Sequence, residues 1–425
     1  MGRESSDLPS GGGGWIRAPP EWGVEPVPSR ARVLRGVDLF VLWSSLGVGI
    51  LVLQAGALMV PSLTLGHAIA VSLLGSVIGS ALLAAAGVIG ARHGVPTMVS
   101  LRPVFGTAGS YIATALNVLQ LVGWTAFELK VMADAASLLS GGGGRVLWLA
   151  AFSAFVALLA IGGPLAVVRQ WLEKFAIWLV YASTAWITYQ VLRSPTWAVT
   201  GGEGGLPWTL ALDLVIAMPI SWMPLVSDYN RFSVRPASGF LGTLLGYTVA
   251  NTWFYALGAA LAALAGQEFV AASILGLYMG ALALVAILVD ETDNAFADVY
   301  SAAVSIQNVF PKVRQWKLVL GVTLTSAILA YTLPLAQYEW FLLLIGATFV
   351  PLFGTTLSEY FLVRRGRVET EEFYERAPRV VWRSLISWAA GLVTYFAVAA
   401  YAPDLGASLP ALAVSALLQL ALRRV

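Results

Sequence analysis

The chain has 425 residues, of which 58% are hydrophobic and only 11% are charged, with a formal net charge of +2. A soluble domain carries about 25% charged residues, so this composition excludes an ordinary soluble protein and indicates an integral membrane protein. The sequence contains no cysteine, which excludes disulfides, cysteine metal sites and thiol chemistry.

Residues 1–36 precede the first long apolar stretch. They are polar, rich in glycine and proline, and contain no apolar core segment, which argues against a cleavable signal peptide. We expect a disordered tail here, because the run Gly11–Gly14 is typical of a flexible segment.

Long apolar stretches then follow one another at short intervals. A helix needs about 20 mostly apolar residues to cross a bilayer, and we count twelve stretches of this kind. They are too long for the strands of a membrane barrel, so we predict a helical bundle. Their approximate centres are Ile50, Ile78, Leu121, Phe155, Tyr181, Met218, Phe254, Leu288, Ser326, Ile345, Leu392 and Ala413.

The basic residues alternate regularly with these stretches. If the N-terminus is cytoplasmic, all of the 25 Lys and Arg residues except Arg145, Arg193 and Lys130 fall on cytoplasmic segments. Positive residues collect in cytoplasmic loops of membrane proteins. The pattern therefore predicts that both termini lie in the cytoplasm, and it supports the number of spans.

Two of the predicted spans contain helix-breaking residues near their middle. The first span, Asp38–Gly49, has paired serines and two glycines, and the sixth, Asp213–Pro224, has Pro219 and Pro224. The two spans are five apart and cross the membrane in opposite directions. Broken helices at matching positions of two inverted repeats indicate a midplane binding site in a secondary transporter. Membrane helices in general are rich in glycine and proline, so one break alone would not indicate a transporter. The prediction depends on the presence of both breaks at matching positions.

The third span places an aromatic residue and an acid on one helix face, Trp124 and Glu128. A charge at membrane depth usually faces a partner, a cavity or a substrate. An indole can stack on a flat ring, and a carboxylate can accept hydrogen bonds from the edge of that ring. An ion pair of Glu128 with Lys130 is the competing interpretation, but Lys130 is better placed for Asp134. We therefore predict that Glu128 binds a nitrogen-rich ring.

The eighth span carries four acids, Asp290, Glu291, Asp293 and Asp298. Residues 290, 294 and 298 fall about one turn apart and form a polar stripe along the helix, which cannot face lipid. For Asp290 and Glu291 an acid-rich span end that dips into water is an alternative, because the apolar residues before them set the depth only loosely.

Between the tenth and eleventh spans, Arg364–Arg383 has mixed charge and is expected to form a solvated cytoplasmic linker.

Six motifs complete the pattern. They are Asp38–Ala57, Gly90–Met98, Arg102–Ser110, Asn117–Glu128, Val226–Phe232 and Asp298–Ser305. Together they resemble the nucleobase:cation symporter-1 family over roughly residues 35 to 365. The nearest subgroup is the one proposed to carry hydroxymethylpyrimidine, a thiamin precursor, and cytosine carriers come next.

The resemblance implies an all-α integral membrane protein that works by alternating access. Its fold would have twelve transmembrane helices, with a LeuT-type 5+5 inverted repeat and broken first and sixth helices. The ten-helix transport core would span residues 37–365. Residues 366–425 would hold a cytoplasmic linker and two additional transmembrane helices.

The resemblance also implies a substrate site. Trp124 and Glu128 match the third-span tryptophan and a ring-binding position that is often glutamine in the family. Trp222 lies in the sixth-span break, where the family covers the substrate with an aromatic residue, and Asn294 and Asp298 should face the cavity. The implied substrate residues are Trp124, Glu128, Ser221, Trp222, Asn294 and Asp298.

A coupling-ion site would lie beside the substrate. Thr292 and Asp293 match positions that give side-chain oxygens to the family's sodium ion, and the carbonyls of Gly47, Ile50 and Val289 would complete the ligands. Asp293 departs from the family, in which a hydroxyl or small residue is commoner. A carboxylate can bind sodium or carry a proton, so both coupling ions are retained, and no cofactor is expected.

Three classes of function can be compared. No nucleophile–base pair, metal cluster or phosphate loop supports an enzyme. A channel would need repeated polar or charged rings around one pore, whereas the paired helix breaks indicate a carrier with a single binding site. We therefore predict a monomeric cation symporter in the cell membrane that binds a small pyrimidine-like ring and no nucleic acid. A cytosine, other nucleobase or hydantoin permease, coupled to protons, is the alternative.

Overall fold

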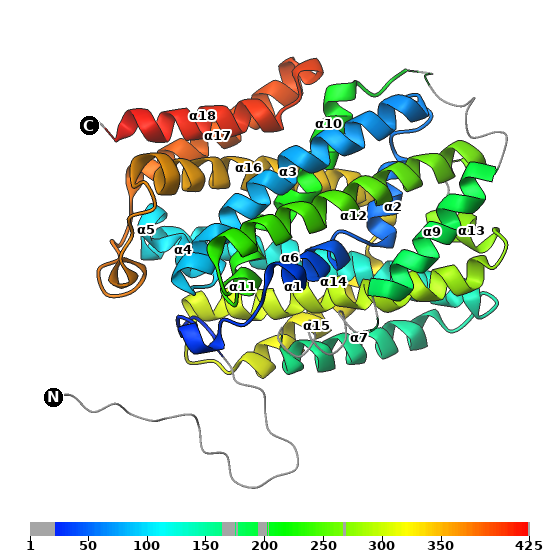
Figure 1. The fold of residues 1–425 in the computed structure, drawn as a ribbon, viewed down its shortest axis with the longest axis horizontal. Coiled ribbons are helices and arrows are strands. Elements are labelled where there is room, and N and C mark those ends of the chain that lie inside the picture. Colours follow the sequence, from blue (N-terminus) through cyan, green and yellow to red (C-terminus); the bar gives the residue numbers. More distant parts are fainter. Residues whose placement is uncertain are drawn as a thin grey trace, which may run out of the picture.

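The computed structural model describes residues 22–163, 175, 177–193, 202, 204–266 and 269–423. This part of the chain is a bundle of helices, most of which run along the long axis of the molecule (Figure 1). The helices of the first half are α1 (Gly36–Ser45), α2 (Ile50–Ala57), α3 (Leu65–His93), α4 (Thr97–Ser100), α5 (Arg102–Phe105), α6 (Thr107–Leu139), α7 (Arg145–Gly162) and α9 (Ile177–Arg193). Those of the second half are α10 (Trp208–Ser221), α11 (Val226–Asn230), α12 (Pro236–Ala265), α13 (Val270–Leu275), α14 (Gly280–Val309), α15 (Gln315–Thr332), α16 (Tyr338–Leu357), α17 (Trp382–Tyr401) and α18 (Ser408–Leu422).

All twelve predicted span centres, from Ile50 in α2 to Ala413 in α18, lie in helices. By length and composition, seven helices of the described residues could each cross a membrane, or eight if α1 and α2 together form one span. The other four are shorter or more polar. α9 has 17 residues and α18 has 15, whereas α14 is long but carries the four acids of the eighth span.

The first span is broken, as predicted. Between α1 and α2 the helix axis bends by 60°. Gly49 directly precedes α2, and a Cβ atom at this position would lie 2.8 Å from Oε2 of Glu291. Glycine therefore allows the broken backbone to approach α14 closely.

The sixth span changes helix type at its break. α10 contains Pro219 and ends at Ser221, and the 3-10 turn η3 (Met223–Leu225) leads into α11. The 23 residues from Trp208 to Asn230 nevertheless form one continuous span. The prolines thus interrupt the α-helical hydrogen bonding without dividing the span as the first one is divided.

Most of the helices pack in two groups. α1, α2, α3, α10 and α12 pack among themselves, and α6, α7, α14 and α15 form the second group. In the first group, the backbones of α2 and α12 touch. A Cβ atom on Gly56 would lie 2.1 Å from the carbonyl oxygen of Tyr255, and one on Gly258 would lie 1.9 Å from that of Leu53. Small residues allow this close packing of membrane helices.

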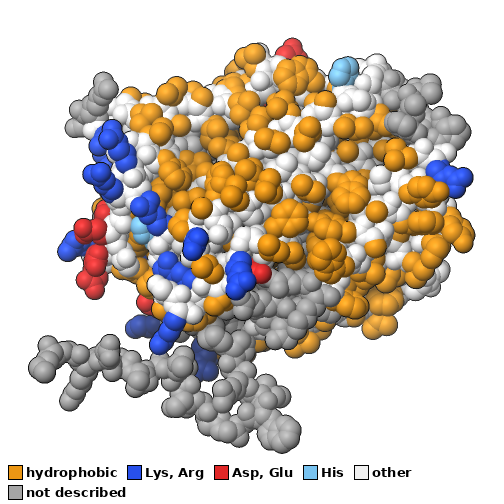
Figure 2. Space-filling view, in the orientation of Figure 1, with side chains coloured by type: hydrophobic (Ala, Val, Ile, Leu, Met, Phe, Trp, Pro, Cys, Tyr) orange, Lys and Arg blue, Asp and Glu red, His pale blue; other side chains and the backbone are white. Residues whose placement is uncertain are grey.

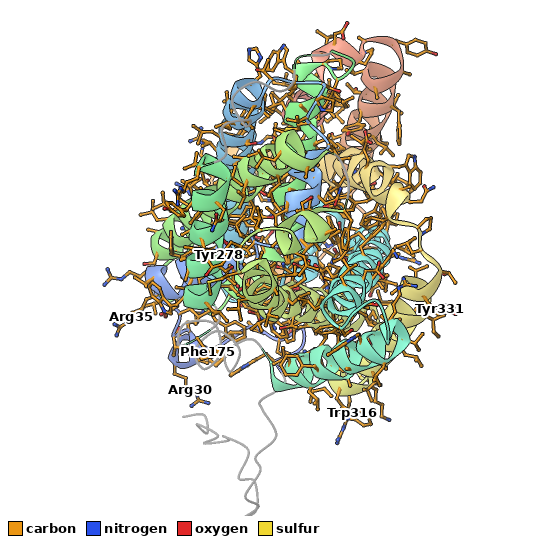
Figure 3. The ribbon with its side chains drawn as sticks, turned by 90° about the vertical axis from the view of Figure 1, so that its right-hand side faces the viewer. Arg30, Arg35, Phe175, Tyr278, Trp316 and Tyr331 are labelled. Carbon is orange, nitrogen blue, oxygen red and sulfur yellow. The ribbon has the colours of Figure 1, made fainter. Side chains whose placement is uncertain are left out.

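The surface separates charge from apolar side chains. Figure 2 shows most Lys and Arg side chains gathered at one end of the molecule, where Figure 1 places α4 and α5, next to a wide apolar surface. In Figure 3, Trp316 and Tyr331 point outward from the rim of the bundle, and their side chains are exposed. They lie near opposite ends of α15, about 22 Å apart along its axis, as expected for aromatic residues at the two membrane interfaces.

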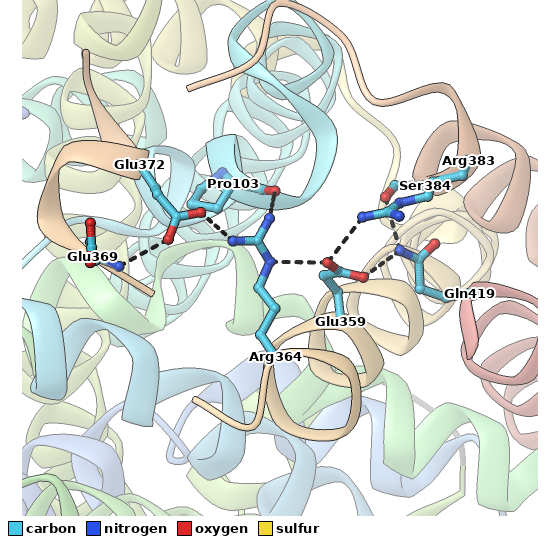
Figure 4. Close-up of polar contacts among 8 residues, drawn as sticks. All are labelled: Pro103, Glu359, Arg364, Glu369, Glu372, Arg383, Ser384 and Gln419. Carbon is cyan, nitrogen blue, oxygen red and sulfur yellow. Dashed lines mark hydrogen bonds and ion pairs between the residues drawn. The ribbon is translucent and has the colours of Figure 1, made fainter. Parts of the chain in front are cut away.

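The mixed-charge segment after α16 is only partly the solvated linker that the sequence predicts. Glu359, in the π-helical turn η5 (Ser358–Val363), accepts hydrogen bonds from Arg364 at 3.0 Å, Arg383 at 3.4 Å and Gln419 at 2.8 Å (Figure 4). Arg364 also pairs with Glu372. These contacts join the segment to α17 and α18, so its charges form a structural network.

Candidate functional site

A cavity lies where the α1–α2 break meets α6, α10 and α14. All six residues predicted to bind substrate line it, and each is at most 6% exposed. The other lining residues come mainly from the break and include Glu291 of α14. The lining is Leu46, Gly49, Leu51, Val52, Trp124, Glu128, Met218, Ser221, Trp222, Glu291, Asn294 and Asp298.

Neighbouring aromatic rings hold the two indoles of the cavity in place. Trp124 makes edge-on contacts with Tyr338 and Phe341, with ring centroids 5.9 and 5.3 Å apart. Trp222 makes an edge-on contact with Trp43 at 6.2 Å. Fixed indoles from two different helices can offer their faces to a flat ligand with little further loss of entropy.

Four buried polar atoms of the lining lack a hydrogen-bond partner in the described part of the chain. They are Nε1 of Trp124, Oε2 of Glu128, Oδ1 of Asn294 and Oδ2 of Asp298. Buried polar groups are nearly always paired in folded proteins, so each exception requires an explanation. Because the four atoms belong to residues that line one cavity, we interpret them as hydrogen-bonding groups that are available to a ligand.

Side chains of α14 satisfy the backbone groups that the first break exposes. Asp290 accepts a hydrogen bond from Oγ of Ser45 at 2.6 Å, and Oε2 of Glu291 accepts one from the Ile50 amide at 2.8 Å. Asn294 donates through Nδ2 to the carbonyl of Val48 at 2.6 Å. Since unpaired backbone groups are costly inside a membrane protein, these bonds fix the break against α14.

The interpretation of Asp290 and Glu291 as an end of the span in water is therefore wrong. Both side chains are buried, at 0% and 1% exposure. The sequence analysis missed Glu291 as a cavity residue, although a signal existed. Glu291 lies three residues before Asn294 and seven before Asp298, which places all three on one helix face.

The residues predicted to bind the coupling ion are not gathered at this cavity. Thr292 and Val289 line a second, apolar cavity of about 540 Å³ beside α6 and α7, and the Thr292 hydroxyl donates to the carbonyl of Val289 at 2.7 Å. Thr292 is two positions from both Asp290 and Asn294, so it points to another side of α14. Asp293 is fully buried, Gly47 lies within the break, and Ile50 is the first residue of α2. No group of three or more acidic or histidine side chains suited to a metal occurs among the described residues.

The substrate cavity is contracted. Its volume is about 20 Å³, which is room for roughly one or two water molecules. A heterocyclic ring needs more space, so its entry requires the two helix groups to separate or the indoles to rotate.

Further predictions concern charges outside the cavity. Lys130 pairs with Asp134 at 2.9 Å, which confirms that it is not the partner of Glu128. Arg231 is buried and donates to the carbonyl of Gly23 at 2.7 Å and to the Tyr300 hydroxyl at 3.1 Å. Arg169, Lys174 and Arg424, which the sequence analysis assigns to the cytoplasmic side, lie outside the described residues.

One positioning residue was not predicted from the sequence. Gln120, one turn before Trp124 on α6, donates through Nε2 to the carbonyl of Ser221 at 3.0 Å and to Oδ1 of Asn117 at 2.8 Å. It therefore ties α6 to the sixth-span break at the edge of the cavity. Its polar type at membrane depth was the available signal.

Comparisons with known proteins agree with this architecture. The hydantoin permease of Microbacterium maritypicum is 26% identical over 421 residues, which cover 89% of this chain and 84% of that protein. The structure of Mhp1, a nucleobase-cation-symport-1 family transporter in a closed conformation with bromovinylhydantoin bound, has a TM-score of 0.83 at 22% identity and covers 96% of both chains. A Na⁺-coupled sialic acid symporter has a TM-score of 0.65 at 13% identity and covers 91% of this chain and 88% of its own.

These likenesses establish a LeuT-type transporter fold, as predicted. The relatives are permeases and transporters, so the chain is not an enzyme. A family model described as a permease for cytosine/purines, uracil, thiamine and allantoin matches residues 26–419. The chain therefore belongs to this family of multi-pass membrane permeases, to which the nucleobase:cation symporter-1 proteins are related.

Proposed function

We propose that this protein imports a pyrimidine-type ring, hydroxymethylpyrimidine or a related aminopyrimidine, by cation symport. The observation that carries the proposal is the cavity between α6, α10 and α14, in which two indoles accompany a buried carboxylate with a free oxygen. The ring would stack on Trp124 and Trp222, and each stacking contact contributes about 1 kcal/mol.

The edge of the ring would bind through Glu128. A carboxylate only accepts hydrogen bonds when ionised, so it favours an exocyclic amine or a ring N–H over a carbonyl. Uracil presents each ring N–H beside a carbonyl that a carboxylate would repel, whereas an aminopyrimidine presents an exocyclic amine with two N–H donors. Asn294, Asp298 and Ser221 would complete the polar contacts around the ring, and the carbonyl of Ser221 is held by Gln120.

Alternating access would proceed by relative movement of the two helix groups. The cavity takes residues from both groups, and its small volume corresponds to a state closed around the site. The charged end of the molecule would face the cytoplasm together with both termini, since positive residues favour that side (Figure 2). We propose that the protein works as a monomer.

The coupling ion would be sodium, held by Thr292, Asp293 and the carbonyls of Val289, Gly47 and Ile50. Oxygen ligands suit such a hard cation. Because Thr292 points away from the break in the closed state, assembly of this site would require α14 to turn or shift relative to α1 and α2. A proton carried by Asp293 is the alternative.

A cytosine or hydantoin permease is the second candidate. The name of the relative from Microbacterium maritypicum supports hydantoin, and the description of the family supports cytosine. Cytosine is a pyrimidine that carries an exocyclic amine and one carbonyl, and hydantoin is a five-membered ring with two carbonyls. They differ in the carbonyl groups that they would present to Glu128.

Thermal stability of the purified protein tests both candidates, because a ligand of the native state raises apparent stability by mass action. The panel is hydroxymethylpyrimidine, cytosine, uracil, adenine, hydantoin and thiamin, each in sodium or in potassium. A shift with hydroxymethylpyrimidine that is larger in sodium supports the proposal. A shift that ignores sodium but follows pH favours proton coupling, and no shift with any pyrimidine rejects the substrate class.

A further inference from the structure

The cavity lining carries three acids and no basic residue. Glu128, Glu291 and Asp298 are among the described lining residues, whereas no Lys or Arg is. Their side chains are at most 4% exposed. Buried charges of one sign are costly unless an opposite charge accompanies them. The lining is thus arranged to receive positive charge.

The three acids differ in how far their oxygens are already used. Glu291 gives Oε2 to the Ile50 amide and thereby caps the first turn of α2. Oε2 of Glu128 and Oδ2 of Asp298 have no hydrogen-bond partner in the described part of the chain. Two separate helices, α6 and α14, therefore each contribute to the cavity lining an acid with an unpaired carboxylate oxygen.

The remaining polar groups also favour a ligand that donates hydrogen bonds. Asn294 uses Nδ2 on the carbonyl of Val48, so its free atom is the acceptor Oδ1. The Ser221 hydroxyl donates to the carbonyl of Met218 at 2.6 Å. Among the described lining residues, the free donor is Nε1 of Trp124. The site thus offers three acceptors from three side chains against one donor.

The indoles suit a cation as well as they suit a flat ring. The face of an indole carries negative charge density and attracts a cation that lies within about 6 Å of it. Trp124 and Trp222 come from different helices, and both line the cavity. A ligand placed between carboxylates and indole faces is stabilised by both if it is positively charged.

We infer that the substrate of this site is a positively charged, donor-rich aromatic heterocycle, for which Glu128 and Asp298 act as counter-ions. An aminopyrimidine that bears an ammonium group belongs to this class. The inference rests on the proposed function, because it takes the cavity to be the transport site. Neutral rings with two carbonyls would turn acceptors toward the carboxylates and bind more weakly.

The test compares two ligands that differ in one group. Hydroxymethylpyrimidine and its aminomethyl analogue share the aminopyrimidine ring, but the analogue carries an ammonium in place of the hydroxyl at neutral pH. Isothermal titration of the full-length protein in detergent gives both affinities. We expect the analogue to bind about tenfold tighter or more, since hydrogen bonds between two charged groups are the strong ones.

Variants then assign the counter-ions. Asp298→Asn and Glu128→Gln should each lower the ratio of the two affinities severalfold while hydroxymethylpyrimidine still binds, which also shows that the variant is folded. Asp134→Asn is the matched control, because it removes an acid from α6 outside the cavity and should leave the ratio unchanged. If Asp298→Asn does not fold, Asp298→Ser replaces it.

The outcomes separate the inference from the proposed function. Equal affinities, or tighter binding of the neutral ligand, overturn the inference and leave the proposed function standing. If neither compound binds, both fail. If the preference for the ammonium persists in both neutralised variants, Glu128 and Asp298 are not its counter-ions.

Discussion

Two buried carboxylates of this protein have opposite surroundings. Glu359 is 1% exposed and accepts hydrogen bonds from Arg364, Arg383 and Gln419 (Figure 4). Glu128 is 4% exposed, and its Oε2 has no partner in the described part of the chain. Burial is the same, but one charge is neutralised from within the chain and the other is left open. The number of internal partners thus distinguishes a carboxylate that joins helices from a carboxylate that is available to a ligand.

The largest effect is expected from Glu359→Gln. The substitution removes the carboxylate that pairs with Arg383 and one of the two that pair with Arg364, and breaking a buried ion pair from one side costs about 3 kcal/mol. Chemical unfolding in detergent should show this loss of stability. Substrate affinity should stay within about twofold, because Glu359 does not line the cavity. A stable variant with altered affinity would abolish the contrast with Glu128.

Glu128→Gln should behave in the opposite way. Replacing the carboxylate removes a charge-assisted hydrogen bond to an aminopyrimidine and should weaken its binding by about 1–3 kcal/mol. Stability without ligand should stay the same or rise, because a buried and incompletely paired charge is lost. Titration calorimetry and unfolding on the same preparation measure both. Unchanged affinity would place Glu128 outside the binding site.

Thr292→Ala sharpens the comparison on the opposite side of α14. The Thr292 hydroxyl donates within its own helix to the carbonyl of Val289, so the free energy of unfolding should change by less than about 1 kcal/mol. If Thr292 binds the coupling ion in another state, the increase of substrate affinity caused by sodium should disappear. Ser153→Ala on α7 removes another hydroxyl that bonds its own helix and serves as the control. Retained sodium dependence would rule out Thr292 as a ligand.

The smallest effect is expected at Glu372, beyond the membrane-spanning part of the chain. Burial acts to raise the pKa of Glu372, but the Glu369 amide and Arg364 outweigh it and lower the pKa below 4.5. A carboxyl whose pKa is lower in the folded state stabilises the protein above its unfolded pKa, and this stability is lost as the pH falls through the folded pKa. The free energy of unfolding should therefore fall less steeply toward acidic pH in Glu372→Gln than in the unsubstituted protein. The difference should be less than about 1 kcal/mol. Parallel pH curves would contradict the pairing.

The predictable part of the site lies within single helices. Trp124 and Glu128 are one turn apart, and so are Asn294 and Asp298, so helical periodicity alone places each pair on one face. Family resemblance then brought the pairs to one cavity, and the structure agrees in placing all four there. The broken first span followed in the same way, from glycines and serines that are adjacent in the sequence.

The unpredicted part depends on contacts between distant segments. That Glu291 reaches the Ile50 amide could not be known before α14 was placed beside the break. Asp213 is similar, because the sixth span uses this acid to accept hydrogen bonds from the amides of Ala407 and Ser408 at the start of α18. Periodicity separates Thr292 from Asp290 and Asn294, but only packing shows that α6 and α7 lie beside it. Composition and periodicity do not reveal these contacts.

The backbone contact between α2 and α12 has an evolutionary consequence. Because Gly56 and Gly258 bring the two chains together without intervening side chains, almost any substitution there would force these helices apart. Selection should therefore preserve these glycines whatever the transported compound is. The acids of the cavity stand on α6 and α14, on the opposite side of the site, where side chains can be exchanged without disturbing that contact. Mutations on α6 and α14 can thus change the ligand during evolution while the contact between α2 and α12 is kept.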